Sequence, residues 1–284
     1  MPKGCWGLVL LLIGLVGAAR AEDAAQAPIR TETDVVYAKA GPVELRADIF
    51  SPPGEGPFPG VLLVHGGGWA LGNKEQMDFH GRALARRGYV AVSINYRLAP
   101  KYKFPAQLDD CRAALEWMRR EAKEHHIDPN WLAVFGYSAG GHLAALVGVT
   151  DAEAVAKEGT EATGLKAIVA GGAPCDFSTV PPQQAILKYW LGGTRAELPE
   201  IYRQASPARF VSAKAPPTFF YHGDSDLLVP RSTSVAMAEL LKAAGVTVES
   251  HVVPGAGHVR AFFDRAAVEA AIGFLDRQRQ ADAR

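Results

Sequence analysis

Ser138 lies in a short motif of small residues, Gly136-Tyr-Ser-Ala-Gly140. The motif follows an apolar run, residues 131–135, with the length and side chains of a buried strand, and the residues after it favour a helix. At such a sharp strand–helix turn the serine is lifted clear of the sheet, beside the backbone N–H groups of the helix start. This geometry suits a nucleophilic serine. An ordinary serine in a glycine-rich turn is the alternative, and residues elsewhere must distinguish the two.

Further polar residues follow predicted strands later in the chain. Asp224 and Asp226 come after the apolar strand 218–221, and His258 lies in a glycine-flanked loop after the last strand. A serine hydroxyl needs an adjacent base. His258 would take its proton, and an aspartate would orient the imidazole and stabilise its charged form. The order serine, acid, histidine is that of the α/β-hydrolase architecture. The spacing leaves both aspartates open, although Asp226 lies deeper in its loop.

Three consecutive glycines, Gly66–Gly68, follow the apolar strand Val61–Val64. Because such a run costs conformational entropy, it indicates a role for the bare backbone. The N–H groups can point into a shared cavity and stabilise a developing oxyanion. A phosphate-binding loop is the alternative, but neither glycine pattern of nucleotide-binding loops follows. We expect His65 to hold this loop by hydrogen bonds and Trp69 to shape the mouth of the cavity.

Strand-like and helix-like segments alternate along the chain, which predicts an α/β fold with a mostly parallel central sheet flanked by helices. Ligands bind such a sheet at the carboxyl ends of its strands, where the residues above lie. Residues 35–39 and 43–50 look like two edge strands, and residues 178–215 like a small cap insertion. The other strands are expected at 61–64, 89–95, 131–135, 166–171, 218–221 and 246–253, and helices at 76–87, 104–124, from 139 onward, 232–244 and near 261–278.

The N-terminus has the features of a secretory signal peptide, residues 1–21. Lys3 supplies a positive charge, residues 6–19 form an apolar run shorter than the ~20 residues needed to span a bilayer, and Ala19-Arg20-Ala21 offers a cleavage site. An uncleaved membrane anchor is the alternative. We therefore expect a secreted or periplasmic protein with a flexible leader at 22–30, a single domain at 31–284 and no stable membrane insertion after cleavage.

Composition and charge narrow the function further. The 284 residues are 48% hydrophobic and carry a formal net charge of zero, which gives no indication of nucleic-acid binding. No cysteine–histidine spacing resembles a zinc site, so we expect neither a metal nor a cofactor. Cys111 and Cys175 are expected to be buried free thiols. The oligomeric state stays undetermined.

Six motifs extend this interpretation from Val61 to His258, most of the mature chain. Together they resemble secreted α/β-hydrolase carboxylesterases, above all bacterial feruloyl and acetyl-xylan esterases and, beside them, the hormone-sensitive-lipase group. Members of that lipase group usually read GDSAGG, and here Tyr137 replaces the aspartate, which favours the feruloyl and acetyl-xylan branch. The motifs are HGGGW, NYRLAP, FPAQLDD, GYSAGGHLA, HGDSDLLVP and GAGH.

The resemblance implies a catalytic triad, an oxyanion hole and substrate contacts. Asp226, and not Asp224, would be the acid of the triad, whose other members are Ser138 and His258. The oxyanion donors would be backbone N–H groups, namely those of Gly67, Gly68 and Ala139, with Gly66 as a further candidate. The residues expected to contact the substrate are Trp69 and Tyr137.

The sequence therefore predicts a secreted serine carboxylesterase that hydrolyses short-acyl or aromatic-acyl esters, with feruloyl and acetyl esters of plant polysaccharide favoured. A small-molecule or carbohydrate ester is the expected partner. An arylformamidase-like amidase or an exopeptidase would use the same site, and matched ester and amide substrates separate these activities. A non-catalytic binding protein on a hydrolase scaffold is the third alternative, although such proteins tend to lose a triad member.

Overall fold

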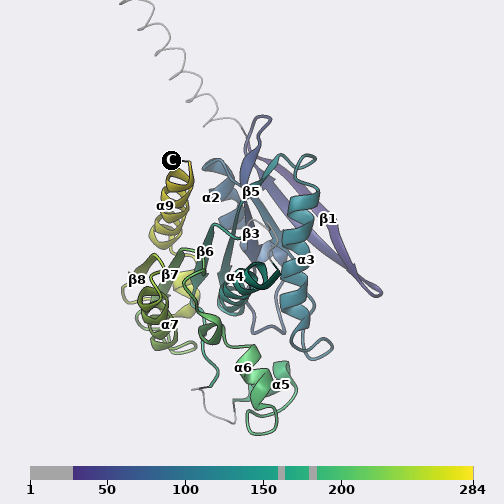
Figure 1. Cartoon of the computed structure of the whole chain (residues 1–284). Coiled ribbons are helices and arrows are strands. Elements are labelled where there is room, and N and C mark those ends of the chain that lie inside the picture. Colours follow the sequence, from purple (N-terminus) through teal and green to yellow (C-terminus); the bar gives the residue numbers. More distant parts are fainter. Residues whose placement is uncertain (1–27, 159–163, 179–183, 284) are drawn as a thin grey trace, which may run out of the picture.

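The computed structural model describes residues 28–158, 164–178 and 184–283 (Figure 1). The predicted signal peptide and most of the predicted leader lie outside the described residues. The described strands form one eight-stranded sheet in the order β1-β2-β4-β3-β5-β6-β7-β8. β2 runs antiparallel to its neighbours β1 and β4, and the other pairs are parallel. The strands are β1 (Arg30–Ala40), β2 (Val43–Ser51), β3 (Phe58–Val64), β4 (Val90–Ile94), β5 (Ile127–Tyr137), β6 (Ala167–Gly171), β7 (Thr218–Gly223) and β8 (Val248–Val253).

Helices cover both faces of the sheet, which explains why the central strands are apolar along their whole length. Every residue of β4, β6 and β7 is buried, as expected of parallel strands between two helical layers. One core packs beneath α3, α4 and α7, and a second core packs beneath α2, α8 and α9. The predicted α/β fold is therefore confirmed. These helices are α2 (Asp78–Arg86), α3 (Ala106–Arg120), α4 (Ala139–Glu158), α7 (Ser232–Ala243), α8 (His258–Phe262) and α9 (Arg265–Asp282).

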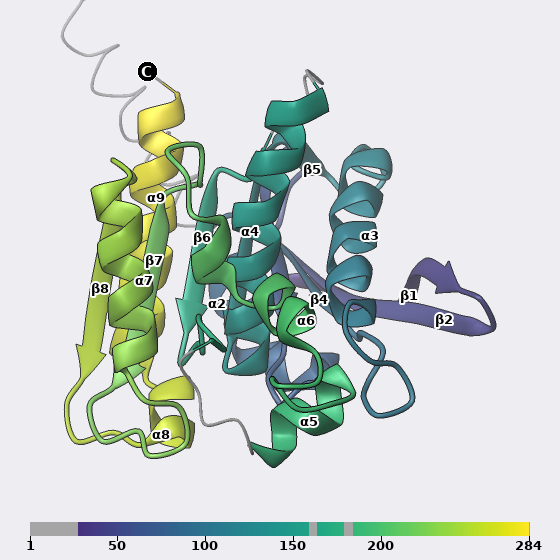
Figure 2. The ribbon, with the colours of Figure 1, turned by 60° about the horizontal axis from the view of Figure 1, so that its bottom comes forward.

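The segment interpreted as a cap contains short helices: α5 (Ala185–Leu191), α6 (Pro199–Gln204) and the 3-10 turn η2 (Pro207–Phe210). Figure 2 shows α5 near the end of the sheet where β6 and β8 terminate and where α8 also lies. The carboxyl ends of the parallel strands, α5 and α8 therefore surround one region of the molecule.

Three boundaries differ from the predictions. Of the two predicted edge strands β1 and β2, only β1 lies at an edge of the sheet, because β2 also pairs with β4. β5 begins at Ile127, earlier than the apolar run at 131–135 indicated. The helix predicted near 261–278 is two helices, α8 and α9, because the Asp264 side chain accepts a hydrogen bond from the Ala267 N–H (2.9 Å) and starts a new helix there. His258 consequently opens α8 instead of lying in a loop.

Two further predictions concern the described part of the chain. Cys111 and Cys175 are buried and unpaired with each other, which confirms them as free thiols. Burial raises the pKa of both thiols, so they stay protonated and unreactive. Among the described helices, none is both long enough and apolar enough to cross a bilayer.

Candidate active site

Ser138 stands at the turn between β5 and α4, with a backbone φ of +57°. A side chain on Gly136 would collide with the carbonyl of Gly140, and one on Gly140 would collide with the carbonyl of Val64 in β3. The two glycines of the motif are therefore required by the closeness of strand and helix. A non-glycine residue with positive φ is uncommon, and the strain at Ser138 is typical of a functional turn.

Asp226 and His258 form a short, buried contact: His258 Nδ1 lies 2.6 Å from Asp226 Oδ2. The other carboxylate oxygen, Asp226 Oδ1, accepts hydrogen bonds from the backbone N–H groups of Leu228 and Val229, each at 2.9 Å. The carboxylate is thus fixed from both sides. The structure brings Asp226 to the histidine, whereas Asp224 Oδ1 accepts a hydrogen bond from the Gly255 N–H (2.7 Å).

Ser138 and His258 line the same cavity of about 400 Å³. Because Nδ1 of the histidine faces a carboxylate, the proton of the neutral ring belongs on Nδ1, and Nε2 is the basic nitrogen. His258 Nε2 is buried and makes no hydrogen bond within the described residues. It is therefore free to accept a proton, and in a substrate-free site the bond from serine to histidine is often not yet formed.

A second histidine also contacts the carboxylate, which the sequence analysis did not anticipate. His222 Nε2 lies 3.2 Å from Asp226 Oδ2 and 2.8 Å from the carbonyl oxygen of Val229, and Nδ1 lies 3.1 Å from Ser234 Oγ. Burial lowers the pKa of His222, so the ring stays neutral and Nε2 carries the proton toward these two acceptors. The histidine four residues before the aspartate in HGDSDLLVP was the available signal.

The glycine loop after β3 faces the same cavity. Gly66, Gly67 and Gly68 line it, and a side chain on Gly67 would collide with the carbonyl of Leu71, which explains why a glycine stands there. Gly67 and Gly68 both have positive φ. Within the described residues, the N–H groups of Gly67, Gly68 and Ala139 donate no hydrogen bond. These three groups remain available for a developing oxyanion.

His65 supports this loop from behind. Its Nδ1 lies 2.7 Å from the Gly66 carbonyl oxygen, and its ring stacks on Tyr96 at 4.2 Å between centroids. Burial lowers the pKa of His65 to about 4, which keeps the ring neutral. His65 therefore holds the loop, as predicted.

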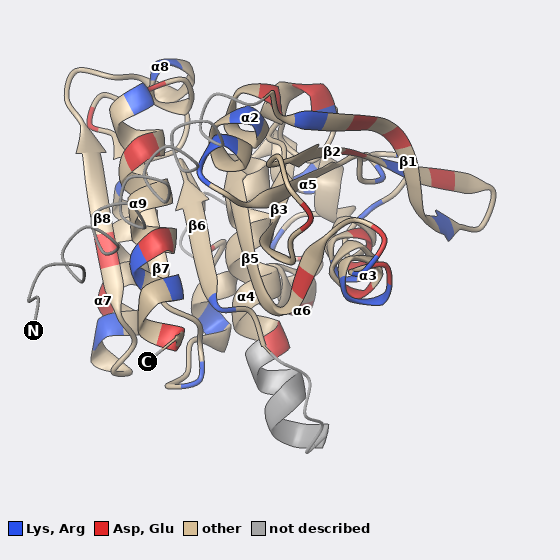
Figure 3. Ribbon diagram, turned by 90° about the horizontal axis from the view of Figure 1, so that it is seen from above, with Lys and Arg blue, Asp and Glu red and all other residues tan. Residues whose placement is uncertain are grey.

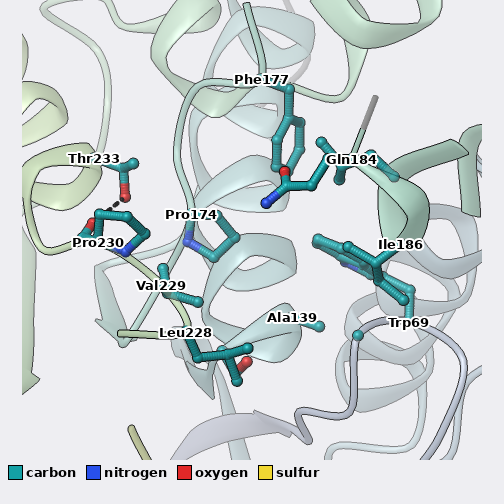
Figure 4. Close-up of a pocket in the computed structure, with 13 residues that line it drawn as sticks. Trp69, Ala139, Pro174, Phe177, Gln184, Ile186, Leu228, Val229, Pro230 and Thr233 are labelled. Carbon is teal, nitrogen blue, oxygen red and sulfur yellow. Dashed lines mark hydrogen bonds between the residues drawn. The ribbon is translucent and has the colours of Figure 1, made fainter. Parts of the chain in front are cut away.

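Trp69 has two roles in the structure. Its indole N–H donates to His142 Nδ1 (3.2 Å), and its ring stacks flat on Trp190 of α5, with 3.9 Å between centroids. Trp69 is buried, but its ring also forms part of the wall of a second, smaller cavity (Figure 4). The predicted contact with substrate is thus limited to this wall, and the residue mainly ties the glycine loop to the cap.

Tyr137 was expected to contact the substrate, but its hydroxyl is used within the protein. The hydroxyl donates to the backbone carbonyl of His258 at 2.6 Å, and the tyrosine is almost fully buried. Tyr137 also lines the larger cavity. Tyr137 therefore holds the backbone of His258, the predicted base.

The two cavities meet at Ser138, which lines both. The smaller cavity has a volume of about 150 Å³ and a largely apolar wall that includes Trp69, Phe177 and Leu187. The larger one opens beside His258 and is bordered by Val259, Phe262 and Phe263. Among the described residues, no group of three or more His, Cys, Asp and Glu side chains is placed to hold a metal ion.

This fold, with serine, histidine and aspartate at the carboxyl ends of its parallel strands, defines an α/β-hydrolase. The chain belongs to the BD-FAE family, whose model matches residues 47–241. It is 32% identical to Esterase LipC of Mycobacterium tuberculosis over 214 residues, which are 71% of this chain and 53% of the relative. The chain thus spans about half the length of this curated relative.

Two solved structures show the same fold. One is a truncated form of a carbohydrate esterase from gut microbiota, with a TM-score of 0.76 and 26% identity, which covers 88% of this chain and 96% of its own. The other is esterase Est2 of Thermogutta terrifontis, with a TM-score of 0.72 and 29% identity, which covers 86% of this chain and 91% of its own. These relatives confirm the resemblance to α/β-hydrolase carboxylesterases.

Proposed function

We propose that this chain is a serine carboxylesterase that forms an acyl-enzyme on Ser138. The observation that carries the proposal is the Asp226–His258 pair, whose free Nε2 shares a cavity with Ser138 and with the glycine loop. His258 accepts the serine proton as Oγ attacks the ester carbonyl, and then protonates the departing alcohol. A water molecule, activated by the same nitrogen, hydrolyses the acyl-enzyme.

The oxyanion that forms on the carbonyl oxygen is stabilised by the N–H groups of Gly67, Gly68 and Ala139. These donors belong to the start of α4 and to a loop that His65 and Trp69 hold rigidly, so they need no reorganisation during the reaction. Removing one such donor typically slows turnover about 100-fold or more.

The two cavities support an assignment of the two halves of the ester. The leaving alcohol must lie beside His258, which protonates it, and this places the alcohol in the larger, open cavity. The acyl group then enters the smaller cavity. A volume of about 150 Å³ holds a group no larger than roughly a benzene ring. This supports short acyl groups such as acetyl. A feruloyl group is larger than a benzene ring, so part of it would lie outside the smaller cavity.

We further propose that the natural substrates are acetyl or feruloyl esters of plant polysaccharide. A neighbouring structure is that of a carbohydrate esterase, and Est2 of Thermogutta terrifontis has been solved with butyrate and with propionate bound. Export to the periplasm or the medium rests on the signal-peptide pattern of residues 1–21. N-terminal sequencing of the protein isolated from the periplasm and from the culture medium tests the export. A chain that still begins at Met1 in these fractions would contradict cleavage of a signal peptide.

The test of the activity compares wild type with Ser138→Ala on p-nitrophenyl acetate, butyrate and decanoate, on methyl ferulate and on acetylated xylan. We expect turnover of the short esters by wild type and its loss in Ser138→Ala, while circular dichroism shows an unchanged fold. Ser225→Ala, in the loop before the catalytic acid, is the matched control and should stay active. Near-wild-type activity of Ser138→Ala, or faster cleavage of a matched amide than of its ester, would refute the proposal.

A covalent probe gives independent evidence. Est2 of Thermogutta terrifontis is phosphorylated by paraoxon. We expect paraoxon to add one phosphoryl group to wild type and to Ser225→Ala, but none to Ser138→Ala, as measured by intact mass. Modification of the Ser138→Ala protein would place the nucleophile elsewhere.

A further inference from the structure

A third cavity, of about 530 Å³, lies between α2 and α9. The catalytic residues do not line it. Figure 3 shows Lys and Arg in blue on both helices. We call this cavity the arginine groove, because four of its lining residues are arginines. Its charged lining residues are Asp78, Arg82, Arg86, Arg87, Arg265 and Glu269.

The arginines of the groove outnumber its carboxylates, and not all of them are neutralised. Arg82 pairs with Asp78 at 2.8 Å, and Arg87 pairs with Glu269 at 3.0 Å and also with Asp276. Two more arginines of the groove have no carboxylate within ion-pair distance among the described residues. These two are Arg86 and Arg265, and both are exposed. A guanidinium group presents a planar fork of donors that matches a carboxylate.

The wall between the charges is apolar. Phe79 of α2 is half-buried, and Ala83 and Val268 lie beside it in the lining. A small inorganic anion would gain nothing from contact with these apolar side chains. A sugar ring presents both a polar edge and a C–H face that packs on an aromatic ring. The combination of free guanidinium groups and a partly exposed phenyl ring fits an acidic sugar.

The arginine groove adjoins the side of the active site where the alcohol leaves. Phe79 packs on His80 (5.3 Å between ring centroids), His80 packs on Phe262 (4.7 Å), and Phe262 packs on Phe263 (4.6 Å). Phe262 and Phe263 border the larger cavity together with His258. One aromatic cluster therefore separates the groove from the cavity that receives the leaving group.

We infer that the arginine groove binds the carboxylate of an acidic sugar in the alcohol part of the substrate. The inference rests on the proposed esterase function and narrows its substrate class to esters on polysaccharides that contain uronic acids. A chain esterified on one sugar would place that ester at Ser138, cross Phe263 and bring a carboxylate of a neighbouring sugar to the guanidinium group of Arg86 or Arg265. The groove thus acts on binding of the polymer and not on bond cleavage.

The test uses two substrates that differ only in the carboxylate: acetylated xylan with uronic acid branches, and the same material with its carboxyl groups reduced to alcohols. The quantity measured is the ratio of kcat/KM for the acidic polymer to kcat/KM for the reduced polymer. We compare wild type, the double variant Arg86→Gln/Arg265→Gln, and Arg279→Gln. The last residue is an exposed arginine near the other end of α9 and serves as the matched control.

We expect the ratio in the double variant to fall about tenfold below that of wild type, through KM, because two exposed charge-assisted contacts are lost. The ratio of Arg279→Gln should equal that of wild type, and raising the salt concentration should lower the ratio of both these proteins but not that of the double variant. A wild-type ratio near one, or an equal ratio in the double variant, overturns the inference. So does cleavage of p-nitrophenyl acetate with no cleavage of either polymer. In all three cases the esterase function stands, whereas failure to cleave p-nitrophenyl acetate refutes that function as well.

Discussion

The hydrogen bond from Tyr137 to the peptide of His258 offers a sharp test of how this site is positioned. Tyr137→Phe removes one buried hydroxyl, which donates to the His258 carbonyl at 2.6 Å, and leaves the ring in place. His258 is the first residue of α8, a helix of only five residues whose N-cap, Gly257, has no side chain to anchor it. The tyrosine is thus a main support of the helix end that carries the base.

The structure sets the size of the expected effects. One buried hydrogen bond contributes about 0.5–1.5 kcal/mol net, so the melting temperature of Tyr137→Phe should fall by roughly 2–6 °C. A shift of about 1 Å in a catalytic group costs up to about 100-fold in rate. We expect kcat to fall about tenfold, between these limits, while KM changes little, because the hydroxyl bonds to the protein and not to the substrate.

Tyr221 provides the matched control. Its ring packs against that of Tyr137 at 5.4 Å between centroids, and its hydroxyl is buried without a hydrogen-bond partner among the described residues. Removing an unsatisfied buried hydroxyl is neutral or stabilises the fold by about 1 kcal/mol. The same chemical change should therefore weaken the enzyme at Tyr137 and leave kcat intact at Tyr221.

Steady-state kinetics on p-nitrophenyl acetate and thermal unfolding of both variants measure these effects. Equal kcat values for Tyr137→Phe and Tyr221→Phe would refute the positioning role. A rise in KM for Tyr137→Phe at unchanged kcat would instead restore the direct substrate contact that the sequence predicted for Tyr137.

Two predictions concern stability. Lys74 is buried, and its Nζ lies 3.0 Å from the Asp48 carboxylate. Lys74→Met would leave that buried negative charge uncompensated, so it should lower the free energy of unfolding, measured by urea titration, by about 3 kcal/mol. An unchanged urea midpoint would contradict this prediction. Burial lowers the pKa of His80, like that of His65 and His142, from 6.5 to about 4. The unfolded chain therefore takes up these protons first, and stability falls as the pH drops from about 6.5 to 4, by at most about 3 kcal/mol for each histidine. His80→Leu should make the melting temperature less dependent on pH in that window, and an equally steep dependence would show that His80 does not contribute.

Local sequence patterns predicted most of the strands and helices, because the spacing of apolar residues reflects which side chains are buried. The fully apolar runs became the parallel strands, and the glycines on either side of Ser138 marked a turn where strand and helix approach too closely for side chains. Where a boundary depended on a single side-chain hydrogen bond, the pattern was insufficient. The apolar periodicity continues past Asp264. The break between the two helices depends on the hydrogen bond that the Asp264 carboxylate accepts from the Ala267 N–H.

Local sequence patterns could not predict contacts between residues that lie far apart in the sequence. Spacing alone left Asp224 and Asp226 open, and the resemblance of the motif selected Asp226. The folded loop agrees with that choice, with the Asp226 carboxylate against His258 and that of Asp224 turned to the Gly255 N–H. For the same reason the sequence predicted a substrate contact for Tyr137 but not the hydrogen bond of its hydroxyl. Its partner carbonyl lies 121 residues further along the chain, which no local pattern shows.

The motifs without catalytic residues have a structural explanation of the same kind. Arg97 of NYRLAP and Asp110 of FPAQLDD form an ion pair at 2.6 Å. Gln107, also of FPAQLDD, donates to the Arg97 carbonyl and accepts from the Trp190 indole N–H at 2.9 Å. Trp190 stacks in turn on Trp69.

This series of contacts links two motifs and the cap to the glycine loop. Trp69 extends these contacts to α4, because its indole N–H donates to His142 Nδ1. His142 Nε2 in turn lies 2.7 Å from the carbonyl oxygen of Ala205, the residue that follows α6. Burial keeps His142 neutral, so Nδ1 accepts from Trp69 and the proton on Nε2 goes to Ala205. NYRLAP and FPAQLDD therefore do not add chemistry: they hold the glycine loop, the helix of Ser138 and the cap in one fixed arrangement, which is what a preorganised oxyanion site requires.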